Sequence, residues 1–147
     1  MKKTTIMIAA VLLSTLSFAQ ETHEKDIPAK DVPAKVKEAL QKQFPNAKEV
    51  KWEKENGHYE AGFDLNKADY SALFDVDGHL METEVEIKLS ELPNGVLAYI
   101  KTKYAGQKVK EAAKITDAKG TVTYEAEIKG MDLLFDSNGK FIKEIKD

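Results

Sequence analysis

The chain has 147 residues, no cysteine and a formal net charge of −3. All 22 basic residues are lysine, so the guanidinium groups that read phosphates and guanine bases are missing, and we predict no nucleic-acid partner. The lack of cysteine excludes disulfides and a cysteine nucleophile. A packed core must therefore supply the stability of this protein.

The first 19 residues have the pattern of a secretory signal peptide. Lys2 and Lys3 precede the apolar run Ile6–Leu13, and Ser17-Phe18-Ala19 supplies small residues for cleavage before Gln20. The run is too short to cross about 30 Å of hydrocarbon, so we expect no membrane span after cleavage. Cleavage removes two lysines and no acidic residue, which lowers the net charge from −3 to −5. The sequence predicts a periplasmic or secreted protein.

An internal repeat follows a polar leader. Residues 20–30 contain the similar motifs DIPAK and DVPAK, and they are expected to be flexible. Two apolar stripes with a spacing of four then predict two helices, the first with Asp31 as its N-cap. We therefore predict one repeat over residues 31–88 and a second over residues 89–147. The stripes are Val32, Val36, Leu40, Phe44 and, 60 positions later, Leu92, Val96, Ile100, Tyr104.

After each predicted helix the apolar residues alternate with polar ones, which indicates strands separated by Gly-containing turns. We predict an α+β protein of two tandem lobes, each a helix packed on a four-stranded antiparallel meander. The eight expected strands lie near residues 50–55, 59–65, 70–75, 80–87, 109–115, 122–128, 131–135 and 141–145.

The stretches FPNAKEVKWEKENGHYEAGF and YSALFDVDGHL resemble the PepSY-like, beta-lactamase-inhibitor-like proteins exported by Bacteroidetes-type bacteria. The matching motifs cover most of residues 32–146. In the second repeat, Ala112 or Ala113 stands where Trp52 aligns. The resemblance implies tandem lobes like those of the secreted beta-lactamase inhibitor protein. It does not imply that this chain inhibits a beta-lactamase.

Two similar turns, LFDVDGHL and LFDSNGKF, raise the question of a metal site. Asp75, Asp77 and His79 alternate in the first turn and could converge on a cation, but an EF-hand loop needs further ligands. Asp-Gly and Asn-Gly also suit a two-residue hairpin turn with positive φ at both central positions. Because Lys140 replaces His79 in the second turn, we favour the β-turn and keep the cation site as the alternative.

No motif in the sequence indicates catalysis. Of the three histidines, His23 falls in the leader, whereas His58 and His79 flank Gly-containing turns that we expect at the surface. We therefore predict that the protein is not an enzyme and needs no cofactor.

The remaining candidates concern a partner. A helix on one face of a sheet leaves the other face open, and an aromatic residue there would anchor a partner. We name Trp52, His58 and Glu60 as candidates, although the core is the favoured place for Trp52. Glu82, Glu84 and Glu86 are expected on a solvent face.

The leading hypothesis is a non-enzymatic exported binding protein, with an inhibitor-like role as one option, that uses the open sheet face and hairpin ends. Its partner would be another envelope protein or a small ligand. The alternative is an envelope protein that binds a small ligand or a divalent cation.

Overall fold

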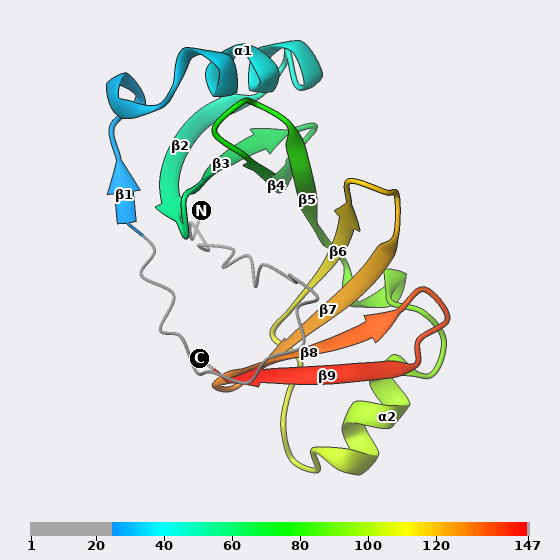
Figure 1. Cartoon of the computed structure of the whole chain (residues 1–147). Coiled ribbons are helices and arrows are strands. Elements are labelled where there is room, and N and C mark those ends of the chain that lie inside the picture. Colours follow the sequence, from blue (N-terminus) through cyan, green and yellow to red (C-terminus); the bar gives the residue numbers. More distant parts are fainter. Residues whose placement is uncertain (1–24, 147) are drawn as a thin grey trace. The chain divides into compact units, whose positions relative to one another are not determined.

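A computed structural model describes residues 25–146 of the chain (Figure 1). The predicted signal peptide, its cleavage site and His23 lie outside these residues. The internal contacts divide the chain into unit 1, which ends at Met81, and unit 2, which begins at Glu82. Unit 1 contains β1 (Lys25–Ile27), α1 (Ala34–Gln43), β2 (Lys48–Glu55), β3 (His58–Leu65), β4 (Ala68–Phe74) and the start of β5 (Leu80–Ile87).

Unit 2 repeats this element order. It contains the rest of β5, α2 (Val96–Lys103), β6 (Glu111–Asp117), β7 (Val122–Ile128), β8 (Met131–Asp136) and β9 (Phe141–Lys146). Within the described residues, neither helix has the length and apolar character needed to cross a membrane.

The prediction of two lobes, each with a helix on a four-stranded meander, is wrong. The nine described strands form one antiparallel sheet in chain order, from β1 to β9, and most of the structured chain is sheet. The alternation in the sequence did not predict how two of the strands, β1 and β5, pair. β1 lies within the predicted leader and pairs with β2, and β5 pairs along Glu82–Ile87 with β6. Each of these two strands therefore precedes a helix and pairs with the strand that follows that helix.

Both helices begin later than their apolar stripes. Val32 precedes Pro33, whose ring disfavours a helical backbone at the residue before it, and Val32 is extended with φ −82° and ψ 132°. The helix therefore starts at Ala34, and Asp31 lies at the end of a 3-10 turn, so its prediction as the N-cap is wrong. In unit 2 a 3-10 turn and Pro93 precede the helix in the same way.

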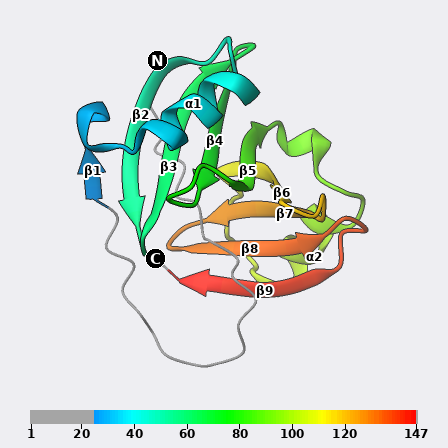
Figure 2. The ribbon, with the colours of Figure 1, turned by 45° about the horizontal axis from the view of Figure 1, so that its top comes forward.

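In unit 1, α1 lies across one face of β2, β3 and β4 (Figures 1 and 2). Val36 and Leu40 point from the helix into a core that also contains Trp52, which is 6% exposed. Because side chains alternate along strands, the residues between these core positions form the opposite face, which we call the helix-free face of unit 1. The strand residues of the core are Trp52, Tyr59, Ala61, Phe63, Ala72 and Phe74.

The core of unit 2 has the same plan. Val96 and Ile100 of α2 pack against one face of β6, β7 and β8. An aromatic cluster adds to this core, in which the ring of Tyr99 lies 5.7 Å from that of Phe135 and 5.1 Å from that of Phe141. The strand residues of the core are Ala112, Ala126, Ile128, Leu133 and Phe135.

Candidate functional site

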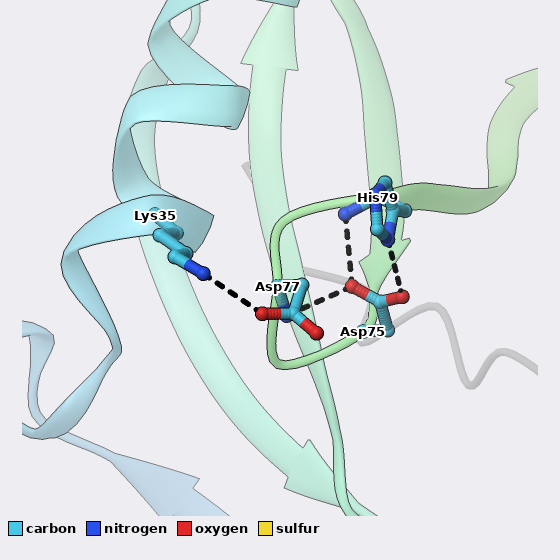
Figure 3. A network of polar contacts seen from close by, with 4 residues as sticks. All are labelled: Lys35, Asp75, Asp77 and His79. Atoms are coloured by element: carbon cyan, nitrogen blue, oxygen red, sulfur yellow. Dashed lines mark hydrogen bonds and ion pairs between the residues drawn. The ribbon is translucent and has the colours of Figure 1, made fainter.

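The turn with Asp75, Asp77 and His79 joins β4 to β5 (Figure 3). The backbone N–H of Asp75 donates to the carbonyl oxygen of His79 at 3.1 Å, and the N–H of Gly78 donates to that of Asp75 at 3.1 Å. Among the residues of this turn, Gly78 alone has a positive φ, of 84°. The turn is therefore a three-residue hairpin loop that ends in a left-handed glycine, and the expectation of positive φ at both Asp77 and Gly78 is wrong.

The carboxylate of Asp75 holds this turn from inside. Its Oδ1 accepts the backbone N–H groups of Asp77 and His79, each at 2.9 Å, and its Oδ2 lies 2.7 Å from His79 Nδ1. These bonds, the one from the His79 backbone first, hold the pKa of Asp75 below its usual range. Lys35 Nζ on α1 donates to Asp77 Oδ1 at 2.9 Å, which raises the pKa of Lys35.

The same turn occurs twice more, in the sequence pattern D-x-x-G. Asp136 Oδ1 accepts the N–H groups of Asn138 and Lys140, each at 2.9 Å. Asp117 Oδ1 accepts those of Lys119 and Thr121, each at 2.8 Å. The first aspartate of each turn therefore acts as a backbone cap, as Asp side chains do in turns. Within residues 25–146, no group of three or more His, Asp or Glu side chains could hold a metal ion.

The glycine of the turn lets it dock on a helix. A Cβ atom on Gly78 would lie 2.6 Å from the carbonyl oxygen of Lys35 and 3.3 Å from Cβ of Ala39. In unit 2, a Cβ atom on Gly139 would lie 2.7 Å from the carbonyl oxygen of Asn94. In both units the turn thus fits against the start of the helix only without a side chain, which explains the likeness of the two sequences by packing.

The structure separates the three predicted partner-binding residues. Trp52 belongs to the core of unit 1, with Ala61 as its cross-strand partner. His58 and Glu60 belong to the helix-free face, where His58 is half-buried and Glu60 is buried. His58 and Glu60 therefore share a surface that Trp52 does not reach.

Three carboxylates stand side by side on this helix-free face. Asp26 on β1 pairs with Glu53 on β2, and Glu53 pairs with Glu60 on β3. Leu73 on β4 is the next residue in this line, and it is 4% exposed. We call Asp26, Glu53 and Glu60 the acidic row. Like charges in directly opposite positions weaken a sheet, so strand pairing alone does not favour this arrangement.

Two more polar groups on the same face are buried. Glu55 is 3% exposed; its Oε1 accepts from Asn56 Nδ2 at 3.3 Å, and its Oε2 has no hydrogen-bond partner. Burial, and then the charge of Glu53, raise the pKa of Glu55. Ser71 is 2% exposed and its Oγ also has no partner. The sequence analysis did not single out Asp26, Glu53, Glu55 or Ser71; the alternation of glutamates in the KWEKE stretch was the available signal.

The glutamates of β5 do not lie on a solvent face. Glu82 is 7% exposed and Glu84 is 0% exposed. β5 is an interior strand, bordered by β6 along Glu82–Ile87, and two buried residues, Ala113 and Ile115, pair with Glu86 and Glu84. The expectation of three solvated carboxylates is therefore wrong.

Comparisons with known proteins identify a family and a fold for this chain, but they assign no ligand or reaction to it. The profile of one family, described as "Putative beta-lactamase-inhibitor-like, PepSY-like", matches residues 19–71 and 63–143. A comparison with curated proteins finds no match. Several solved structures from Bacteroides species share the fold.

Three of these structures show the extent of the likeness. A protein from Bacteroides eggerthii, described among "putative periplasmic proteins", is 20% identical, with a TM-score of 0.70 over 78% of this chain and 88% of its own. A DUF2874 family protein from Bacteroides uniformis is 24% identical, with a TM-score of 0.69 over the same shares. A BLIP-like protein from Bacteroides fragilis is 24% identical, with a TM-score of 0.65 over 82% of this chain and 87% of its own.

Proposed function

Because the chain belongs to the family described as beta-lactamase-inhibitor-like and PepSY-like, we propose that it is an exported binding protein without catalytic activity. In this proposal, the helix-free face of unit 1 contacts a partner protein in the periplasm or outside the cell. Export is supported by the pattern of residues 1–19 and by the periplasmic description of the similar Bacteroides eggerthii protein.

One observation carries the proposal: unit 1 has carboxylates where unit 2 has apolar residues. Tyr59 and Tyr124 are equivalent in the two units, so Glu53, which pairs with Glu60, is equivalent to Ala113, which pairs with Glu125. By the same register, Glu55 is equivalent to Ile115. The sheet therefore forms without these two carboxylates.

Charges that a fold does not need mark functional positions. Glu55 and Ile115 are equally buried, at 3% exposed each, but a buried carboxylate is far less favourable than a buried isoleucine. Natural sequences keep such locally unfavourable residues mainly where function requires them. On this face, Asp26 is exposed and Glu53 is half-buried, so their charges can reach a protein surface, where charge arrangement determines the choice of partner.

A comparison of two charge reversals tests this proposal. Glu53 lies half-buried on the helix-free face, and Glu38 lies exposed on α1. The mature protein, residues 20–147, would be immobilised and exposed to a periplasmic extract of the producing bacterium. We expect the wild type and Glu38→Lys to retain the same protein, and Glu53→Lys to lose it. Retention of that protein by Glu53→Lys, or of no protein by the wild type at any salt concentration, contradicts the proposal.

The alternative of a divalent-cation carrier uses Asp75, Asp77 and His79. In this turn, backbone N–H groups already bind Asp75 Oδ1, and the ammonium group of Lys35 neutralises Asp77. Calorimetric titration with calcium, zinc and copper tests it on the wild type and on Asp77→Ala. Heat that appears in the wild type and disappears in the variant would favour this alternative.

A further inference from the structure

We propose that Asn56, at the tip of the hairpin of β2 and β3, is a site of spontaneous deamidation, and that its conversion to aspartate or isoaspartate weakens this hairpin. The inference concerns a chemical modification of the chain and is independent of the proposed function. The sequence contains three Asn-Gly dipeptides, at residues 56–57, 94–95 and 138–139, and the structure distinguishes the first from the other two.

The reaction takes place within the chain and consumes only water. The backbone nitrogen of the residue after the asparagine attacks the side-chain carbon Cγ, and the new C–N bond closes a succinimide ring. The amide nitrogen leaves as ammonia and takes the proton of the attacking N–H. Water then opens the ring at either carbonyl group, which gives aspartate or isoaspartate. Glycine favours the attack because it places no side chain beside the nitrogen and its backbone rotates freely.

Asn56 and Gly57 leave both the attacking nitrogen and its peptide plane free. They are exposed, with φ 47° and 84°, and they form a two-residue turn between the paired residues Glu55 and His58. Among residues 25–146, no backbone oxygen accepts the N–H of Gly57. A Cβ atom on Gly57 would have no neighbour within 4 Å, so the peptide plane between Asn56 and Gly57 has room to turn.

At Asn138 and Gly139 the attacking nitrogen already makes a hydrogen bond. The N–H of Gly139 donates to the carbonyl oxygen of Asp136 at 2.9 Å, and the N–H of Asn138 donates to Asp136 Oδ1 at 2.9 Å. Attack on the side chain of Asn138 requires the first of these bonds to break. One net hydrogen bond corresponds to a factor of about ten in rate, so we expect Asn138 to react about ten times more slowly than Asn56.

At Asn94 and Gly95 the peptide plane is held by packing, although both residues are exposed. The carbonyl oxygen of Asn94 lies only 2.7 Å from the place that a Cβ atom on Gly139 would occupy. Gly95 is the N-cap residue of α2, and its carbonyl oxygen accepts the N–H of Tyr99 at 2.8 Å. Turning this plane therefore disturbs the start of α2, and we expect slow deamidation here too.

Deamidation of Asn56 would act on the buried Glu55. Asn56 Nδ2 donates to Glu55 Oε1 at 3.3 Å, a longer distance than usual, so the bond restrains Asn56 only weakly. The product has a carboxylate in place of this donor, next to a group whose pKa burial and the charge of Glu53 already raise. Isoaspartate also lengthens the backbone of a turn that fits two residues. Both products should therefore weaken the hairpin.

Mass spectrometry of tryptic peptides tests the inference on the mature protein, residues 20–147. Because every basic residue is lysine, trypsin places the three dipeptides in separate peptides, residues 55–67, 89–101 and 130–140. After incubation of the folded protein at mildly alkaline pH, we expect deamidation in the first peptide to be about ten times faster than in the other two. In urea, the three rates should approach one another.

Asn56→Gln is the control for the first peptide, which also contains Asn66. Glutamine would have to close a larger ring, so this variant should lose the modification. Deamidation of Asn94 or Asn138 in the folded protein at least as fast as that of Asn56 overturns the inference. The same holds if Asn56 reacts in urea but stays unmodified in the folded protein.

Two further variants test the effect on the hairpin. Asn56→Asp copies one product, and Asn138→Asp makes the same change in the turn of unit 2. In urea unfolding at neutral pH, Asn56→Asp should raise the equilibrium constant for unfolding about tenfold. Asn138→Asp should change it by about twofold or less, as most surface substitutions do. An Asn56→Asp protein as stable as the wild type overturns the proposed weakening of the hairpin.

Discussion

In unit 1, Trp52 is the cross-strand partner of Ala61; at the equivalent place in unit 2, Ala112 is the partner of Ala126. The aromatic clusters also differ in position. Unit 1 gathers Phe44, Phe63 and Tyr70, with 4.9 Å between the first two rings and 5.8 Å between the last two. Unit 2 instead gathers Tyr99, Phe135 and Phe141. Unit 1 has Ala39 and Leu80 where unit 2 has Tyr99 and Phe141, so the aromatic residues have moved to other places in the same core.

The comparison shows which positions the fold constrains. Large apolar side chains exchange places between the units because a core accepts different shapes if its total volume is filled. Gly78 and Gly139 do not vary, because a side chain at either would overlap the helix backbone. On the helix-free face the opposite holds: Glu53 and Glu55 have no acidic equivalent in unit 2. We therefore expect core changes to affect stability, and a change of the half-buried Glu53 on this face to affect binding.

The largest effect is expected from the one tryptophan. Trp52→Ala removes a side chain that is 6% exposed, and it should lower the free energy of unfolding by about 3–5 kcal/mol. Urea unfolding followed by circular dichroism measures this change. Phe135→Ala, with a side chain that is 0% exposed in unit 2, is the matched control and should have a similar effect. A loss below about 1 kcal/mol for Trp52→Ala would contradict its place in the core.

The turn glycines test whether docking on the helix constrains both units alike. Gly78→Ala and Gly139→Ala should each destabilise by about 2–4 kcal/mol, because alanine meets both an unfavourable positive φ and a backbone oxygen. Gly57→Ala separates the two causes, since Gly57 has φ 84° but a Cβ atom there would have no neighbour within 4 Å. It should lose only about 1–2 kcal/mol. Equal losses at all three positions, measured in urea, would show that the close approach is unimportant.

Local signals in the sequence were sufficient for most elements of the fold. β2 to β9 lie where alternation and Gly-containing turns predicted strands, because both signals arise within a few residues. β1 was missed because three residues in a polar segment show no period. The partner of β5 was missed because pairing of Glu82–Ile87 with β6 depends on residues far along the chain.

The helix-free face was harder to predict because it depends on strand register. Glu49 has φ 51° in an irregular stretch of β2, where the register shifts between Lys48 and Lys51. Simple alternation predicted that Val50 and Trp52 share one face. Because of this irregularity, Val50 is instead 37% exposed and does not join Trp52 in the core. The sequence indicated His58 and Glu60 on β3. Asp26 and Glu53 join them only because β1 pairs with β2 and β2 pairs with β3.

The pH dependence of stability tests the contrast between Glu55 and Ile115. The pKa of Glu55 is raised above 4.5 in the folded protein, so the native state binds this proton more tightly than the unfolded state does. Its stabilising contribution is complete below about pH 4.5 and disappears as the pH rises through the folded pKa. Relative to Glu55→Gln, the wild type should therefore lose stability as the pH rises above 4.5.

Urea unfolding of both proteins between about pH 4 and pH 8 measures this difference, because contributions from other groups cancel. Glu55→Ile, which copies the residue of unit 2, should be at least as stable as the wild type at pH 7. If the difference in free energy of unfolding between the wild type and Glu55→Gln stays constant over the whole range, the raised pKa of the buried Glu55 carboxylate is contradicted.

The smallest effect concerns the residue that ends each helix. Phe44 ends α1 and contacts Phe63, whereas the equivalent Tyr104 ends α2 and its hydroxyl group donates to Glu144 Oε2 at 2.6 Å. This hydrogen bond, together with some burial, raises the pKa of Tyr104 to about 12. Tyr104→Phe, which copies unit 1, should reduce stability at pH 7 by about 1 kcal/mol or less.

The stabilisation by Tyr104 should depend on pH with a known sign. Because its folded pKa is raised, the contribution is fully present below about pH 10 and is lost as the pH rises through about 12. Absorbance titration near the tyrosinate band should show one group in the wild type that ionises near pH 12 and is missing in Tyr104→Phe. If the group that Tyr104→Phe removes ionises near pH 10 instead, the bond to Glu144 does not persist in solution, and the helix ends of the two units would then be equivalent.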